Sequence, residues 1–239
     1  MTTPNSKYKV LAIDTNPKTI KSRVKGLALT GICYLAPSHL SGIADVCHYA
    51  TDGCRIACLN VAGRGAMNSV QVARVRKTER FFKDSANWYA NLDRDIESLK
   101  RKAKAIELQA AARLNGTSDI PWERIASARA LMEKHSTVQF YDYTKYPYAK
   151  RPAESLPSNY HLTYSLGDNS RIPEALECLR NGRNVAVVFR HELPEQWQGF
   201  PVIDGTAHDY RPADPVGVVV GLVAKGKAAM LDQSGFIQD

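Results

Sequence analysis

Short apolar segments alternate with amphipathic helical segments along most of the 239 residues, and this alternation restricts the fold more than any other feature. Residues 108–114, 137–143, 160–166, 184–189 and 216–223 have the length and composition of buried strands. Helical segments separate several of these strands. Strands that alternate with helices are typical of an α/β domain with a mostly parallel sheet. We therefore expect an α/β fold.

Two helical segments stand in succession in the first half of the chain. The first is expected from about Asn68 to Lys83, and the second follows a capping residue at Asp84 or Ser85. In the second helix, apolar residues recur at steps of three and four, which is the spacing of one helix face. A further helix is expected to open at residues 121–123, with Ser118 or Asp119 as its N-cap.

The length of the chain suits one large domain with its own apolar core. We expect a single α/β domain over residues 1–239. Residues 1–35 would form N-terminal strands, residues 36–66 a cysteine loop, and residues 67–239 the helix pair and a barrel-like remainder. The specific architecture we expect is a partial parallel (β/α) barrel.

Polar or ionisable residues follow nearly every expected strand. In barrels and open α/β sheets the active site forms at the carboxyl ends of the strands, so these residues are expected to surround one pocket. The alternative is that strands end at polar turns in any case. The residues are Asn115, Ser118, Asp119, Asp142, Lys145, Ser165, Asp168, Arg190, Asp204 and Lys225.

Within this set, two roles are assigned by chemistry. Asp142 and Lys145 have opposite charges three residues apart and are candidates for base and acid in proton transfer, or for an ion pair that fixes the loop. The candidates for binding the polar ends of a cofactor or substrate are Asn115, Ser118, Asp119, Ser165 and Asp204.

Three of the five cysteines fall within twelve residues. Cys47, Cys54 and Cys58 have the spacing C-x6-C-x3-C, and an odd number of cysteines argues against a set of disulfides. Three thiolates on one loop suit a [4Fe–4S] cluster with one open iron. The alternatives are zinc, which prefers four ligands, and plain buried or reactive thiols.

Positive charge is concentrated in the N-terminal half. The formal net charge is +8, and residues 71–106 alone hold ten basic and five acidic residues. Such a block attracts polyanions, so we expect a nucleotide or a nucleic acid as a partner of residues 71–106. The alternative is the solvated face of a helix pair.

Two other classes of protein are disfavoured. The sequence has no apolar run of membrane-spanning length, and its first residues lack the apolar core of a signal peptide. We therefore expect no membrane association and a cytoplasmic location, where thiols stay reduced.

Several motifs along the chain resemble those of an uncharacterised phage family called gene product 88. The resemblance covers most of the chain after about residue 25 and implies a phage or prophage protein, hence the host cell cytoplasm. It implies no specific activity. The motifs are Ala36-Pro37, Cys47…Cys54…Cys58-Leu59, Gly63-Arg64-Gly65, Ala73-Arg74…Lys77-Thr78, the segment 113–120, the segment 141–145, Thr163-Tyr164-Ser165 and Asp204-Gly205…Asp209-Tyr210-Arg211.

More distantly, a cysteine triad that precedes a partial barrel is similar to radical S-adenosylmethionine (SAM) enzymes. Their usual spacing is C-x3-C-x2-C with an aromatic residue before the last cysteine, whereas this loop is longer and has Ala57 there. The resemblance implies a [4Fe–4S] cluster and SAM as cofactors and a radical modification of a nucleotide or nucleic acid. The alternative function is a zinc- or cluster-stabilised protein that binds nucleic acid or a host partner without catalysis.

Overall fold

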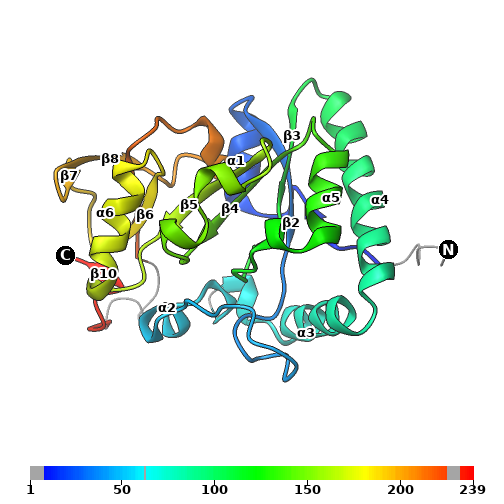
Figure 1. The fold of residues 1–239 in the computed structure, drawn as a ribbon, viewed down its shortest axis with the longest axis horizontal. Helices are drawn as coiled ribbons and strands as arrows, with labels where there is room; N and C mark the ends of the chain where they lie inside the picture. The colour runs from blue at the N-terminus through cyan, green and yellow to red at the C-terminus, as the bar shows by residue number, and fades with distance from the viewer. Residues whose placement is uncertain (1–7, 62, 225–231) are drawn as a thin grey trace.

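A computed structural model describes residues 8–61, 63–224 and 232–239. Its centre is an open, ten-stranded sheet with helices on both faces (Figure 1). The strand order is β1-β2-β3-β4-β5-β6-β9-β8-β7, and β10 pairs with β6. The strands are β1 (Leu11–Ile13), β2 (Ala28–Cys33), β3 (Gln109–Arg113), β4 (Gln139–Thr144), β5 (Tyr160–Ser165), β6 (Val185–Phe189), β7 (Gln196–Trp197), β8 (Phe200–Asp204), β9 (Val219–Val223) and β10 (Ile237–Gln238).

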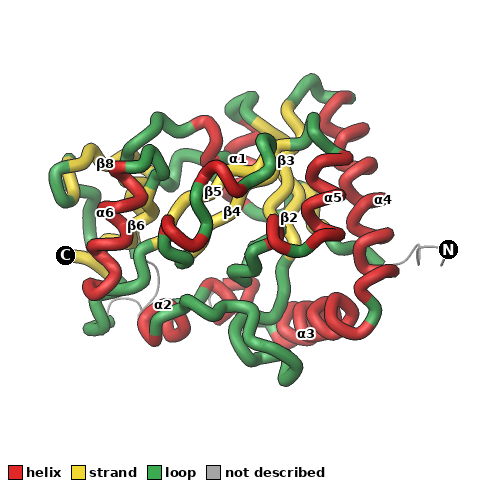
Figure 2. Tube along the Cα trace, viewed as in Figure 1, coloured by secondary structure: helices red, strands yellow, loops and turns green. Residues whose placement is uncertain are grey.

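The helices connect these strands as the sequence pattern indicates. Figure 2 shows them flanking the sheet and gathering below one edge of it. The α-helices are α1 (Pro17–Val24), α2 (Asp52–Ile56), α3 (Asn68–Lys83), α4 (Ser85–Lys104), α5 (Ala126–Lys134) and α6 (Ile172–Arg180). The 3-10 helices are η1 (Leu59–Val61), η2 (Gly63–Ala66), η3 (Trp122–Arg124), η4 (Tyr148–Lys150), η5 (Ala153–Ser155), η6 (Asn169–Arg171) and η7 (Arg211–Ala213).

The sheet is parallel except at its two edges. Strands β2 to β6 run parallel in sequence order, and β9 and β8 extend the same direction beyond β6. Only β1 and β7 add antiparallel pairings to the described sheet. A parallel connection needs a crossover between strands, and the helical segments provide it. The expectation of a mixed α/β fold with a mostly parallel sheet is confirmed.

The helix pair also forms as expected. Helix α3 ends where the sequence predicts, and Asp84 separates it from α4. The apolar positions of α4 are buried because they face the sheet, with Leu92, Ile96 and Leu99 completely inaccessible. They pack with Trp88, Trp122 and Phe140 in the larger of the two main apolar clusters.

One capping prediction is wrong. The segment after β3 begins with η3, which has Pro121 at its N-cap, and α5 begins only at Ala126. Ser118 and Asp119 cap neither helix, because their side chains bond elsewhere. Ser118 donates to the Asn115 amide oxygen, and Asp119 accepts from the backbone of Lys145.

The two faces of the sheet differ in polarity. Register places Phe140 and Leu162 on the face that α4 and α5 cover, and Tyr141 and Thr163 on the opposite face. Helix α1 and the crossover from β8 to β9 cover that second face, where Asp209 bonds to Arg113 at 2.8 Å and to Tyr141 at 3.1 Å. Buried polar groups thus fasten the crossover to the strands.

The end of the last long strand was expected at Lys225. Strand β9 ends at Val223, and Lys225 lies outside the described residues. Among the residues that the structure describes, no helix is both long and apolar enough to cross a bilayer.

Candidate metal centre

The cysteine loop lies across the carboxyl ends of the parallel strands. At its first cysteine, the Cys47 thiol donates to the Thr117 carbonyl after β3, at 3.9 Å, and accepts from the Ser38 N–H at 3.4 Å. The backbone N–H of Asp119 donates to the Val46 carbonyl at 2.8 Å. The loop is therefore anchored to the ends of β2 and β3.

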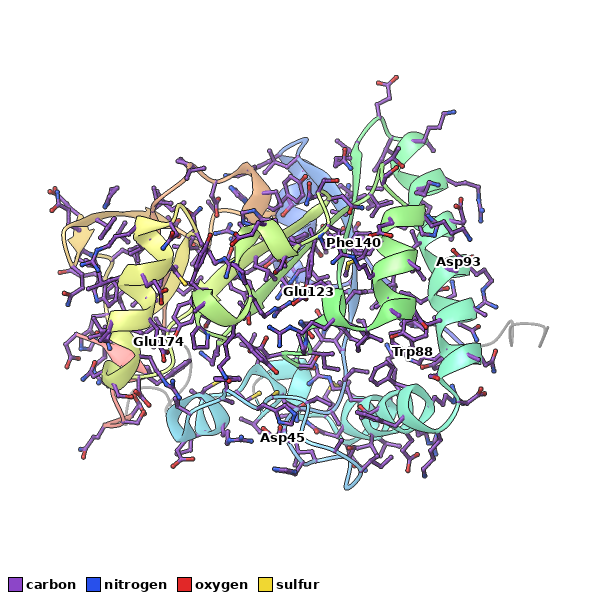
Figure 3. The ribbon with its side chains drawn as sticks, viewed as in Figure 1. Asp45, Trp88, Asp93, Glu123, Phe140 and Glu174 are labelled. Carbon is purple, nitrogen blue, oxygen red and sulfur yellow. The ribbon has the colours of Figure 1, made fainter. Side chains whose placement is uncertain are left out.

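The second cysteine lies in α2, which is anchored to the end of β5. Thr51 caps this helix by accepting from the Cys54 N–H, and its hydroxyl donates to the Gly167 carbonyl at 2.9 Å. A Cβ atom on Gly53 would overlap Ser234 and lie 2.6 Å from the Phe236 Cβ, so only glycine fits here. Figure 1 shows α2 below the strands, and Asp45 marks the same loop in Figure 3.

The three thiols of the loop are electrostatic neighbours. Each is partly buried and none is in a disulfide. Burial raises the pKa of Cys47 to about 12, and Asp119, Cys54 and Cys58 each add to the rise. Burial also raises the pKa of Cys58, with a further contribution from Cys54. The fold thus brings together three cysteines that are separated by up to eleven positions.

Two cations approach the third cysteine. Arg74 of α3 and Lys145 after β4 both oppose the rise in the pKa of Cys58. Arg74 is only 9% exposed, donates to the side chain of Asn60, and lies 5.1 Å from the ring centre of Tyr34. Positive charge beside the loop favours thiolates and an anionic group bound to them.

Among the described residues, no group of three or more His, Cys, Asp or Glu side chains is arranged to hold one metal ion. The donor set that the fold gathers is therefore three neighbouring thiols, with cations at its edge.

The structure places Lys145 at this site but directs Asp142 elsewhere. The Lys145 ammonium donates to the Ser165 carbonyl, the Ser165 hydroxyl and the Leu166 carbonyl, and lies 5.0 Å from the ring centre of Phe236. Asp142 is 1% exposed, and its carboxylate accepts from the Asn115 N–H at 2.8 Å and from the Tyr160 hydroxyl at 3.0 Å. The base-and-acid role of the two residues stays a prediction, and their charged groups have different partners.

Three of the expected ligand-binding residues belong to one loop after β3. The Asn115 amide oxygen accepts from Ser118 Oγ, the Ile120 N–H and Trp122 Nε1, at 2.8 to 3.0 Å. Asp119 is 8% exposed, and burial raises its pKa. Ligand binding by Asn115, Ser118 and Asp119 stays a prediction, and the hydrogen bonds show that they hold the loop.

The other two expected ligand-binding residues lie apart from each other. Ser165 accepts from Lys145 and so borders the cysteine loop. Asp204 ends β8 and is exposed, and its carboxylate accepts from the backbone and hydroxyl of Thr206 at 2.7 Å. The hydrogen bonds from Thr206 lower the pKa of Asp204, and Lys18 and Lys21 of α1 lower it further, so this carboxylate lies near α1.

Sequence reasoning missed a buried guanidinium. Arg151 is completely inaccessible and bonds to Glu123 through Nε at 2.9 Å and Nη2 at 2.6 Å. It also contacts Asp119 at 3.4 Å and Tyr160 at 3.3 Å. Figure 3 shows Glu123 near the centre of the molecule. No local pattern marks Arg151, because its partners come from the segment 119–123, from Thr144 of β4 and from Tyr160 of β5.

One protein-family model identifies the family of this chain. The model of the family described as Gene product 88 matches residues 9–239. The chain belongs to the Gene product 88 family. The match includes the cysteine loop, the buried Arg151 and the C-terminal strand of this Gene product 88 protein. No curated protein and no solved structure matches the chain.

Proposed function

We propose that this Gene product 88 protein is an iron–sulfur enzyme of the radical SAM type, with a [4Fe–4S] cluster bound by Cys47, Cys54 and Cys58. The observation that carries the proposal is the position of three neighbouring cysteines at the carboxyl ends of β2 to β5. In parallel α/β sheets this edge is where ligands bind. The sequential parallel order of β2 to β6 is also the order of strands in a partial barrel.

The number of thiols that the loop supplies supports a cluster more than zinc. Structural zinc takes four ligands on one ion, so its ligands converge on a point. In a cluster each thiolate binds a different iron, so the sulfur atoms stand farther apart. The loop supplies three neighbouring thiols, one fewer than the four ligands of structural zinc and the number that a [4Fe–4S] cluster with one open iron takes. Arg74 and Lys145 would partly balance the negative charge of three thiolates and their cluster.

When bound, such a cluster with one open iron would chelate SAM and pass it an electron from an external one-electron reductant. The residues of this chain would provide the surroundings. Lys145 would keep a cation beside Cys58 while its Nζ holds the end of β5. Phe236 and Ser234 would cover α2 and limit the access of water. Ser165 would offer its hydroxyl at the same edge.

The proposed substrate is a nucleotide or a nucleic acid. Several basic residues of the segment 71–106 serve the fold instead, since Lys77 donates to the Val10 carbonyl and Arg94 to the Tyr8 carbonyl. Those that remain exposed can neutralise phosphates in solution. They are Arg76, Arg80, Lys83, Arg101, Lys102 and Lys104.

The test is the metal and sulfide content after anaerobic purification. The proposal expects a brown protein with equal iron and acid-labile sulfide. Cys54→Ala should abolish both, whereas Cys33→Ala should retain them, because Cys33 lies fully buried in the apolar core. A cluster that survives loss of Cys54, or a colourless protein with stoichiometric zinc, would contradict the proposal.

A cluster alone does not establish the reaction, so SAM needs its own test. Addition of SAM to the reduced protein should change the electron paramagnetic resonance spectrum of the cluster and yield methionine. An unchanged spectrum would leave a cluster-stabilised binding protein as the function. In that case nucleic-acid affinity should fall steeply with salt, because it would depend on phosphate neutralisation.

A further inference from the structure

Exposed aliphatic side chains gather around the cysteine loop. Of the eleven large apolar side chains that are exposed in the described part of the chain, seven fall between residues 40 and 72, and the other four are spread over the rest. Exposed apolar side chains that occur singly are normal, whereas a contiguous group marks a surface that another molecule covers. The seven are Leu40, Ile43, Ile56, Leu59, Val61, Met67 and Val72.

Hydrogen bonds join η1, η2 and the start of α3 into one unit. The Gln71 amide nitrogen donates to the Asn60 carbonyl at 2.6 Å and to the Gly65 carbonyl at 2.5 Å. A Cβ atom on Gly65 would overlap the Leu59 carbonyl oxygen, so η2 packs directly on η1.

Four of the seven aliphatic side chains lie within two residues of these contacts, and a fifth belongs to α2, which precedes η1 in the layer below the strands (Figure 1). Ile56 is 59% exposed and Leu59 is 71% exposed. We call the group the aliphatic surface, and its members are Ile56, Leu59, Val61, Met67 and Val72.

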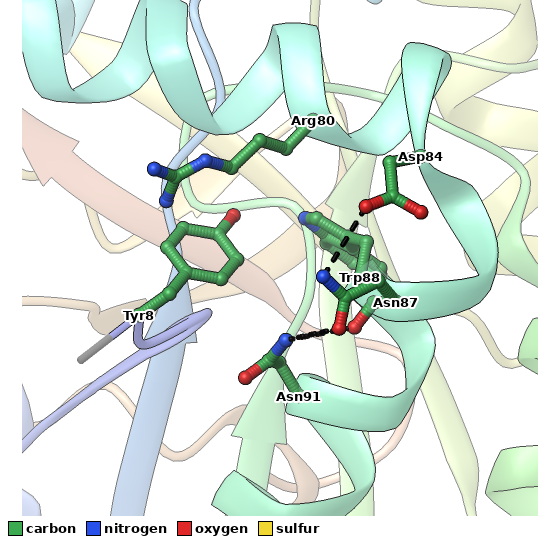
Figure 4. Close-up of a pocket in the computed structure, with 6 residues that line it drawn as sticks. All are labelled: Tyr8, Arg80, Asp84, Asn87, Trp88 and Asn91. Carbon is green, nitrogen blue, oxygen red and sulfur yellow. Dashed lines mark hydrogen bonds between the residues drawn. The ribbon is translucent and has the colours of Figure 1, made fainter. Parts of the chain in front are cut away.

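The opposite end of α3 is already covered by the chain itself. The Arg80 guanidinium lies 4.1 Å from the ring centre of Tyr8, and both residues line a cavity of about 80 Å³ at the start of α4 (Figure 4). The segment before β1 therefore packs on this end of the helix. The first turns of α3 instead remain exposed at Met67 and Val72.

The charges around the aliphatic surface balance. Residues 40–72 include two acidic and two basic residues, so the net charge of +8 belongs to the rest of the chain. Asp45 pairs with Arg55 at 3.2 Å. Asp52 and Arg64 are exposed and have no ion-pair partner among the described residues. The aliphatic residues of the segment 56–61 lie between these two charges in sequence.

This chemistry favours a second copy of the chain as the molecule that covers the surface. A nucleic acid or an acidic protein is attracted by an excess of cations, and single strands also stack on aromatic rings. The surface has neither feature. Two chains with a net charge of +8 repel each other unless they meet at a neutral face. In a two-fold contact the same patch serves both copies, so Arg64 of one copy can pair with Asp52 of the other.

We propose that two copies of the chain associate about a two-fold axis through the aliphatic surface, with Leu59 near the centre and Arg64 against the partner's Asp52. Leu59 directly follows Cys58, and Ile56 lies between Cys54 and Cys58. The second copy therefore covers the thiols and limits the access of water to them. The dimer does not depend on the cluster or on the proposed reaction.

The test is sedimentation of the full chain over a wide range of protein concentration, in the presence of a thiol reductant that prevents disulfides between copies. The mass should rise with concentration from 26.5 kDa to twice that value. Leu59→Asp should raise the dissociation constant of the dimer on the order of a hundredfold or more, because each dimer carries the charge twice in an apolar contact.

The matched control is Val216→Asp. Val216 is 79% exposed and precedes β9, at the opposite end of the strands from the cysteine loop. This variant should associate as the natural chain does. Leu59 is also exposed, so near-ultraviolet circular dichroism should show both variants folded.

Charge reversal tests the two-fold arrangement. Arg64→Glu alone and Asp52→Lys alone should each weaken the dimer roughly two- to thirtyfold, because the contact occurs twice. The chain with both changes should recover most of the affinity. Arg101→Glu, near the end of α4, should have no such effect.

Three outcomes would overturn the proposal. A chain that stays monomeric at every concentration means that the surface serves a partner of other chemistry. Association that survives Leu59→Asp, or that Val216→Asp weakens equally, means that the copies meet at another face. A double charge reversal that is no better than the single ones means that Arg64 does not face the partner's Asp52.

Discussion

Asp142 should make the stability of the protein depend on pH in an unusual direction. Its carboxylate is 1% exposed and accepts from the Asn115 N–H at 2.8 Å and from the Tyr160 hydroxyl at 3.0 Å. Burial raises its pKa from 3.8 to about 7, although the cations of Arg113 and Arg151 oppose the rise. The folded chain therefore retains a proton that the unfolded chain releases.

The magnitude follows from proton linkage. Below about pH 4 both states hold the proton, and this contribution to stability is fully present. As the pH rises toward 7, the unfolded state loses the proton first, so the free energy of unfolding falls. The slope for one proton is at most about 1.4 kcal/mol per pH unit. Over the three units involved, the upper limit is about 4 kcal/mol.

The assay is urea unfolding at pH 5, 6, 7 and 8, with the same metal content in all samples. Asp142→Asn keeps the shape, accepts from Asn115 through its oxygen and donates to Tyr160 through its nitrogen. The variant should gain stability relative to the natural chain as the pH rises from 5 to 7. Asp214, whose pKa burial raises to about 6, titrates in both chains, so the difference isolates Asp142.

Asp239→Asn is the control, because that carboxylate is 81% exposed. The difference in the free energy of unfolding between Asp239→Asn and the natural chain should change with pH by only a small fraction of the change expected for Asp142→Asn. Parallel stability curves for Asp142→Asn and the natural chain would show that Asp142 is ionised throughout and that burial does not raise its pKa.

Three further substitutions have defined effects, two on the free energy of unfolding, measured by urea titration, and one on the rate of proteolysis. Asn115→Ala should cost roughly 2–6 kcal/mol, because the Ile120 N–H and Trp122 Nε1 lose their acceptor; a loss within 0.5 kcal/mol would show that water replaces it. Gly53→Ala should release residues 232–238 from α2 and increase proteolysis there, since the new Cβ overlaps Ser234; unchanged digestion would contradict this. Arg151→Met should cost about 3–5 kcal/mol by leaving Glu123 unpaired, and Glu123→Leu in the same chain should recover part of it.

Local patterns were sufficient for most of the secondary structure. The helix over Asn68–Lys83 begins and ends where the sequence predicts, and the helix that follows it begins at Ser85 as expected. Their apolar spacing and polar boundaries act within one or two turns, so no distant contact is needed to recognise them. The cap at residues 118–119 failed because a tertiary partner, the backbone of Lys145, competes for Asp119.

The sequence could also locate the candidate site, but it could not predict which side chains contact one another within it. The spacing of three cysteines and the polar strand ends predicted one edge of a parallel sheet, and the cysteine loop lies there. Which polar side chains remain free to bind a ligand depends on their hydrogen-bond and ion-pair partners from distant segments. Asn115 is occupied by its own loop, and Arg74 reaches Cys58 from another helix.

By itself, the sequence determined the elements, the clustering of three cysteines and the basic first half, because period, spacing and charge are local properties of a chain. Only the tertiary structure decided that Asp142 and Lys145 have different partners, that Arg151 joins Asp119 to Glu123, and that Trp88 and Asn91 share a cavity. The physical reason is that strand register and helix packing bring together residues from distant segments. The hydrogen-bonding state of a buried polar group is fixed by those partners and not by its neighbours in sequence.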